Sequence, residues 1–182
     1  MNPTLKDILY STNNQKILHY LLEHIEEEYY DRQISRLTGI SRAGTNFALR
    51  ELVKADLLQR NKKGKMVFYK LEQKNTFIKY LKIIQNITTL QPLIEKLIAS
   101  SIRIILYGSA SKGENRDKSD FDIFILSRYP KETKKTIFES TLRNRIQCII
   151  NTLNEFIILK RKNKLFCKEI EDGIVLWEEK KI

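Results

Sequence analysis

The chain has 182 residues, enough for one or two small domains, and a formal net charge of +11 from 33 basic and 22 acidic residues. This positive excess favours polyanionic partners such as DNA, RNA or nucleotides. No apolar run reaches the length of a membrane span and no signal-peptide pattern begins the chain, so we expect no membrane partner and a cytoplasmic location. The two cysteines, Cys148 and Cys167, lack the spacing of a metal site.

The first sixty residues carry three helical patterns. The first runs over 15–30, where apolar residues recur on one helix face. The second begins at Asp31, a good N-cap, and ends at Gly39, which suits a left-handed C-terminal cap. Ser41 caps the third. Its expected buried side consists of Phe47, Ala48, Leu49, Leu52, Val53 and Leu57.

A basic hairpin follows these helices. Alternating residues predict strands over 58–60 and 66–71, and a turn over 61–65 contains Gly64 and three lysines. Three helices followed by a basic hairpin resemble a winged helix, the helix-turn-helix variant common in prokaryotic regulators. The resemblance implies a DNA-binding domain over residues 1–72.

The same resemblance implies that the third helix enters a major groove with its N-terminal residues foremost and that the hairpin contacts phosphates. The exposed candidates on the helix are Ser41, Arg42, Thr45, Asn46 and Arg50, and those on the hairpin are Lys62, Lys63 and Lys65. The alternative is a protein-interaction or packing module whose basic hairpin only aids solubility.

Residues 73–90 form an expected connecting helix. Phe77, Tyr80, Leu81, Ile84 and Ile87 recur at helical spacing. Pro92 suits the first turn of a separate helix, so we expect the connector to end near residue 88. The apolar stripe is either a core-packing face or the seam of a homodimer, since winged helices usually bind two half-sites as pairs.

The most specific pattern lies between Ile104 and Leu126. An apolar run ends at Gly108-Ser109, ten residues follow, and Asp120-Phe121-Asp122 opens a second apolar run. Residues i and i+2 of a strand point to the same face, so the two carboxylates project together with Cα atoms about 6–7 Å apart. Such a pair repels unless a cation lies between, which indicates Mg²⁺ carrying a nucleoside triphosphate.

This pattern resembles the nucleotidyltransferase superfamily that includes DNA polymerase beta, in its minimal prokaryotic form. The resemblance covers residues 91–182 and implies a small mixed-sheet α/β domain, so the whole fold would be α+β. ATP or another NTP would be the substrate and Mg²⁺ or Mn²⁺ the cofactor. The implied roles are triphosphate binding by Gly108 and Ser109, charge neutralisation by Lys112 and Arg116, and catalytic metal binding by Asp120 and Asp122. The alternative for the loop is a solvated surface segment.

The family places a third metal-binding carboxylate on the next strand, expected here over 145–152. By that resemblance the third acid falls on Gln147, which carries no charge, and its loss weakens the second metal most. Glu155 is the nearest acid that could substitute. The remaining elements are expected to be helices over 130–143, 154–162 and 165–170, and a final strand over 173–177.

Two classes of function fit these patterns. One is an enzyme that transfers a nucleotidyl group to a hydroxyl of a protein or nucleic acid. Similar minimal proteins adenylylate a nuclease toxin, so the resemblance implies a toxin-like protein partner. The other is a transcriptional regulator whose nucleotidyltransferase fold is catalytically degenerate and senses a nucleotide or binds a partner. A scaffold with two nucleic-acid-binding surfaces is a third hypothesis.

Overall fold

The computed structural model describes residues 4–117 and 119–180. The chain divides into two compact units, Met1–Gln85 and Asn86–Ile182. Each unit has its own sheet and its own hydrophobic core.

The first unit packs helices around a three-stranded antiparallel sheet of order β1-β3-β2. Its core contains fully buried side chains from α2, α3 and α4, among them Ile17, Ile34 and Leu49. The elements are α1 Leu5–Leu9, α2 Asn13–Glu23, β1 Tyr29–Tyr30, α3 Asp31–Thr38, α4 Arg42–Lys54, β2 Leu58–Lys63 and β3 Met66–Leu71.

The first expected helix is shorter than the sequence pattern suggested. It ends at Glu23, and Tyr29 and Tyr30 form a strand that pairs with β3 opposite Tyr69 and Phe68. Aromatic residues suit a pleated, half-buried surface. Tyr29 is buried there, so packing against β3 outweighs continuation of the helix.

The caps of α3 and α4 agree with the sequence in part. Gly39 ends α3 with φ +71°, and the Ser41 hydroxyl accepts a hydrogen bond from the Gly44 N–H at 3.2 Å. Asp31 is the first helical residue rather than the N-cap, a position held by Tyr30. Phe47 does not join the core, since it is 65% exposed.

The hairpin is longer and its turn tighter than expected. β2 and β3 stay paired out to Lys63 opposite Met66, which leaves Gly64 and Lys65 as a two-residue turn. Gly64 has φ +62°, a conformation that favours glycine.

A single helix, α5 Thr76–Leu97, replaces the two helices expected around Pro92. An interior proline removes one backbone hydrogen bond and costs roughly 3 kcal/mol. Pro92 lies on the exposed side of the helix, whereas Leu93, Ile94 and Leu97 are buried in the main core of the second unit. Burial of this apolar face offsets the cost and keeps the segment helical.

The N-terminal part of α5 has an unusual distribution of polarity. Its inward side buries Lys82, whose Nζ donates to the Leu22 carbonyl, and Gln85, whose Nε2 donates to the His19 carbonyl at 3.1 Å. On the outward side, three members of the apolar stripe are exposed, so the core-packing role is wrong for them. They are Phe77 at 55%, Tyr80 at 61% and Ile84 at 43%.

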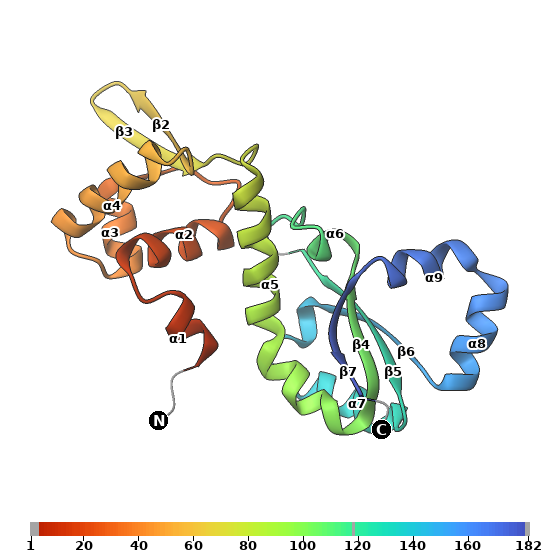
Figure 1. Cartoon of the computed structure of the whole chain (residues 1–182). Coiled ribbons are helices and arrows are strands. Elements are labelled where there is room, and N and C mark those ends of the chain that lie inside the picture. Colours follow the sequence, from red (N-terminus) through yellow and green to blue (C-terminus); the bar gives the residue numbers. More distant parts are fainter. Residues whose placement is uncertain (1–3, 118, 181–182) are drawn as a thin grey trace. The chain divides into compact units, whose positions relative to one another are not determined.

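The second unit is built on a four-stranded sheet of order β6-β5-β4-β7 (Figure 1). β4 pairs antiparallel with β5 and β7, and β5 pairs parallel with β6. The elements are the 3₁₀ turn η1 Ile98–Ser100, β4 Ser101–Tyr107, α6 Gly108–Ser111, β5 Phe121–Ser127, α7 Pro130–Phe138, the 3₁₀ turn η2 Arg143–Arg145, β6 Ile146–Asn151, α8 Leu153–Lys162, α9 Lys164–Glu171 and β7 Ile174–Glu178.

Alternation along β5 assigns its side chains to two cores. Phe121, Ile123 and Ile125 pack in the core formed with α7 and the C-terminal part of α5. Phe124 and Leu126 pack in a separate, smaller core of the same unit, to which α8 and α9 contribute. Asp122 shares the parity of Phe124, so its side chain lies on the α8–α9 side of the sheet.

In the described part of the chain, no helix combines the length and apolar character needed to cross a membrane.

Candidate functional site

The candidate site lies where β4 ends and β5 begins. Tyr107, the last residue of β4, is opposite Asp122 in the antiparallel register, and Gly108 follows with φ +68°. A Cβ added to Gly108 would lie 3.2 Å from Cγ of Asp122 and closer still to its Oδ2. Glycine is therefore required at residue 108 for two reasons. It adopts the positive φ without strain, and it leaves free the space that the Asp122 carboxylate occupies.

Negative charge concentrates around Asp122. Burial raises the pKa of its carboxyl above the ordinary value, and the charges of Asp120 and Glu169 raise it further. Burial, followed by the charges of Asp122, Glu169 and Cys148, also raises the pKa of the Tyr107 phenol to about 12. Groups that disfavour one another's negative charge make a site suited to a cation.

Glu169 is a contributor that the sequence analysis missed. It lies on α9, 47 positions after Asp122, and no local spacing connects the two. The available signal was amphipathic: Phe166 and Ile170 mark the buried side of α9, and Glu169 is the residue next to Ile170 in the sequence. Glu169 also lines a cavity of about 260 Å³ together with Gly108, Ser111, Lys112, Leu165, Lys168 and Asp172.

The position of the expected third acid is occupied by Gln147. The parallel register of β5 and β6 sets Gln147 directly beside Asp122, and its side chain is exposed. Its amide oxygen can offer a neutral ligand but no charge.

Glu155 cannot substitute for the missing acid, contrary to one expectation. It follows the C-terminal end of β6, whereas Asp122 lies near the N-terminal end of the parallel neighbour β5. Its carboxylate accepts hydrogen bonds from the Thr152 N–H at 2.7 Å and the Thr152 hydroxyl at 2.8 Å. These bonds cap α8 and lower the pKa of Glu155.

The loop after Gly108 is folded back on itself. The Ser109 carbonyl accepts the Glu114 N–H at 2.9 Å, and the Ser111 hydroxyl donates to the Gly108 carbonyl at 2.8 Å. Ser109 is exposed, and Lys112 lines the cavity. Arg116 is exposed farther along, where its N–H donates to the Ser119 hydroxyl at 3.0 Å.

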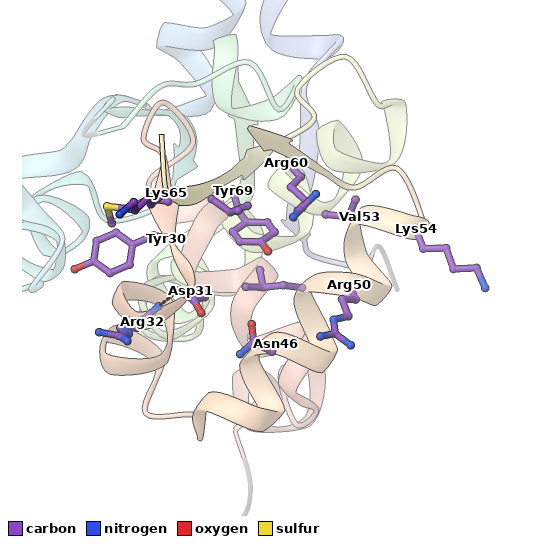
Figure 2. A pocket seen from close by; sticks show the side chains of 13 residues that line it. Tyr30, Asp31, Arg32, Asn46, Arg50, Val53, Lys54, Arg60, Lys65 and Tyr69 are labelled. Atoms are coloured by element: carbon purple, nitrogen blue, oxygen red, sulfur yellow. Dashed lines mark hydrogen bonds between the residues drawn. The ribbon is translucent and has the colours of Figure 1, made fainter. Parts of the chain in front are cut away.

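A groove of about 930 Å³ in the first unit lies between α4 and the hairpin (Figure 2). Figure 2 shows Arg32 and Lys65 on one side, Arg50 and Arg60 on the other, and Tyr69 between them. The lining contains five basic residues, Arg32, Arg50, Lys54, Arg60 and Lys65, against one acid, Asp31.

The expected nucleic-acid residues fall into three groups. Asn46, Arg50 and Lys65 line the groove. Ser41, Arg42 and Lys62 are exposed outside its lining. The side chains of Thr45 and Lys63 are already engaged within the unit.

The expectation that Thr45 contacts nucleic acid is wrong, because this residue is fully buried and cannot reach a partner. It lies on the face of α4 that also buries Ala48 and Leu49. Lys63 is exposed but paired: its Nζ lies 2.6 Å from the Glu28 carboxylate and 5.2 Å from the centre of the Phe68 ring.

Arg32, Lys54 and Arg60 are groove residues that the sequence analysis missed. Arg50 and Lys54 are four residues apart and therefore share one helix face, which was a usable signal. Arg32 and Arg60 join them through tertiary structure, because α3 and β2 converge on α4 only in the folded unit.

The comparisons with known proteins bear on the second unit. The family model described as Polymerase beta, Nucleotidyltransferase matches residues 94–182. This match supports placing that segment in the nucleotidyltransferase superfamily. No curated protein and no solved structure matches the chain.

Replacing Asp122 by Asn is expected to stabilise the free protein at pH 7. The native pKa is raised, so the folded state resists ionisation of this carboxyl, and the cost is fully present above that pKa and disappears as the pH falls below the ordinary value of 3.8. Because the group is only partly buried, the expected gain in Tm is about 1–3 °C at pH 7, shrinking towards pH 4.

Thermal unfolding followed by circular dichroism at both pH values measures this gain. Glu155→Gln is the control of opposite sign: the pKa of Glu155 is lowered by the helix cap, so its loss should reduce Tm at pH 7. A lower Tm for Asp122→Asn at pH 7 would show that the carboxylate is stabilised where it lies.

Proposed function

We propose that the second unit binds a nucleoside triphosphate with Mg²⁺ or Mn²⁺ and transfers its nucleotidyl group to a hydroxyl of a protein or nucleic acid. The observation that carries this proposal is the packing of the Asp122 carboxylate against Gly108, with Asp120 and Glu169 adding negative charge. The match of residues 94–182 to the nucleotidyltransferase family supports it.

The residues divide the work by charge and position. Asp120 and Asp122 hold the cation, and the exposed Ser109 begins the turn that takes the triphosphate. Gly108 lets the backbone approach the phosphates without a side chain between them. The bound cation would supply positive charge at the reacting phosphoryl group.

Basic side chains at the loop assist the leaving group. As the acceptor oxygen bonds to the α-phosphorus, the bond to the pyrophosphate breaks and negative charge accumulates on the leaving oxygens. Lys112, at the cavity wall, is placed to neutralise that charge, and Arg116 extends the positive potential along the loop.

A second function is favoured by one observation, the neutral Gln147 beside Asp122. With two carboxylates, those of Asp120 and Asp122, instead of three, the site suits one cation better than two. Under this alternative the unit binds a nucleotide or partner without turnover, and the chain acts as a regulator.

The enzyme predicts label transfer from [α-³²P]ATP in the presence of Mg²⁺ or Mn²⁺ to the chain itself or to an added acceptor. Asp120→Asn and Asp122→Asn should each reduce transfer by about 100-fold or more, because each removes an anionic ligand. Glu155→Gln removes an acid that follows the C-terminal end of β6, at the opposite end of the strands from Asp122, and should leave transfer near wild type. Nucleotide binding without any transfer by the wild type would support the regulator instead.

Gln147→Asp is expected to strengthen the cation site, because it restores a third carboxylate in register with Asp122. Isothermal titration with Mn²⁺ should show affinity increased by about tenfold. Gln147→Asn shortens the side chain without adding charge and is the matched control. Equal affinities in the two variants would mean that residue 147 does not face the cation.

For the first unit we propose DNA binding by a winged helix. The three-stranded sheet, the order of α3 and α4 before the hairpin, and the basic groove along α4 support it. Phosphates would lie in the groove against Arg50, Arg60 and Lys65. The exposed stripe of Phe77, Tyr80 and Ile84 on α5 supports a homodimer as the DNA-bound form.

The double variant Arg50→Ala/Arg60→Ala tests this groove. The plot of log affinity against log salt has a negative slope, and each lost phosphate contact makes that slope less steep by about 0.9. The double variant should therefore make it less steep by about 2. Fluorescence anisotropy with a mixed-sequence DNA duplex at several salt concentrations measures the slope. Lys16→Ala/Arg36→Ala removes two basic residues outside the groove lining, and an equal effect in this control would rule out the groove.

A further inference from the structure

Two asparagines in the second unit form a buried amide pair. Asn86, on α5, and Asn115, in the loop after α6, are each 4% exposed. Nδ2 of Asn86 donates to Oδ1 of Asn115 at 2.8 Å, and Nδ2 of Asn115 donates back to Oδ1 of Asn86 at 3.3 Å. The amide hydrogen bonds are therefore reciprocal.

Asn86 also holds the backbone of the loop. Its Nδ2 donates to the Ala110 carbonyl at 2.9 Å, and Ala110 is fully buried. The Asn86 side chain thus holds the segment 108–115 at two points, the Ala110 carbonyl near its start and the Asn115 side chain at its end.

Packing by itself does not require this arrangement. Leu90, one turn farther along α5, is fully buried and apolar, and a buried amide is unfavourable unless its polar atoms are paired. The amide pair supplies direction instead, because hydrogen bonds fix the orientation of the loop backbone whereas apolar contacts tolerate sliding.

The fixed segment is the one that meets the proposed triphosphate. Gly108 lies against the Asp122 carboxylate. Lys112, which lies in sequence between the anchored residues Ala110 and Asn115, lines the cavity. A loop that binds phosphates loses affinity when it must be ordered on binding, so anchoring it beforehand preserves affinity for the phosphates.

We propose that Asn86 is a positioning residue that, with Asn115, holds the 108–115 loop ready for the triphosphate of the nucleotide. This inference rests on the proposed nucleotide binding and extends it to a residue that contacts no substrate. It accounts for a polar residue on a helix face that otherwise contributes Leu90, Leu93 and Leu97 to the core.

The test compares the affinities of ATP and AMP, each with Mn²⁺, by isothermal titration. Asn86→Ala is expected to weaken ATP binding by about tenfold and AMP binding by less than about twofold, because the loop serves the β- and γ-phosphates. A general loss of structure would instead reduce the bound fraction for both ligands and leave the ratio of the two affinities unchanged.

Ser127→Ala is the matched control. Ser127 is also buried, and its hydroxyl donates to the Ser100 carbonyl at 2.9 Å at the far end of β5. This variant should lower Tm without changing the preference for ATP. If Asn86→Ala does not fold, Asn115→Ser, which shortens the other member of the pair, is measured in the same way.

Hydrogen exchange in the free protein provides a readout that needs no nucleotide. Amides within residues 109–116 should exchange faster in Asn86→Ala than in wild type, while those of β4 and β5 keep their rates. Unchanged exchange of the loop would overturn the proposal.

The outcomes separate the two proposals. Wild-type protein that binds neither ATP nor Mn²⁺ overturns the proposed function and the positioning role together. Wild-type protein that prefers ATP, with the same preference in Asn86→Ala, overturns the positioning role and leaves the proposed function intact.

Discussion

The close approach of a carboxylate to a glycine backbone is the constraint on which the site of the second unit depends. Asp122 fits against Gly108 because β4 and β5 are antiparallel neighbours and because residue 108 has no Cβ. The same pairing sets the side of the sheet on which Asp122 lies, and therefore brings α9 and Glu169 to it. The contact therefore depends on the strand register and on the absence of a Cβ at residue 108, and the same register brings the charge of Glu169 close to Asp122.

Acidic side chains lie near Asp122 in the second unit, and Lys112 and Lys168 line the cavity together with Glu169. Burial and then the charges of Asp120 and Glu169 raise the pKa of Asp122, a free-energy cost that a bound cation would relieve. Because Gln147 is neutral, it adds nothing to this cost, whereas a carboxylate at that position would add to the cost and would also attract a cation more strongly. Stability of the protein without a cation and strength of cation binding would therefore oppose each other at this position.

Local signals made much of this structure predictable. The Ser41 cap and the hairpin follow from spacing of a few residues, and alternation places Asp122 within β5, whereas Asp120 precedes the first residue of that strand. The failures required knowledge of distant partners. Thr45 is buried because of the phase at which α4 packs, Pro92 stays helical because the next residues join a core, and Glu169 approaches from another helix.

The buried polar residues of α5 also limit how the chain can change in length. Surface connectors usually accept insertions at little cost. In α5, however, Lys82 and Gln85 bind carbonyls of the first unit, and Asn86 binds a carbonyl of the second. Within the first unit, one residue inserted between Lys82 and Gln85 would turn one of these side chains about 100° away from its carbonyl. An insertion in this stretch of α5 is therefore expected to break one of these two hydrogen bonds.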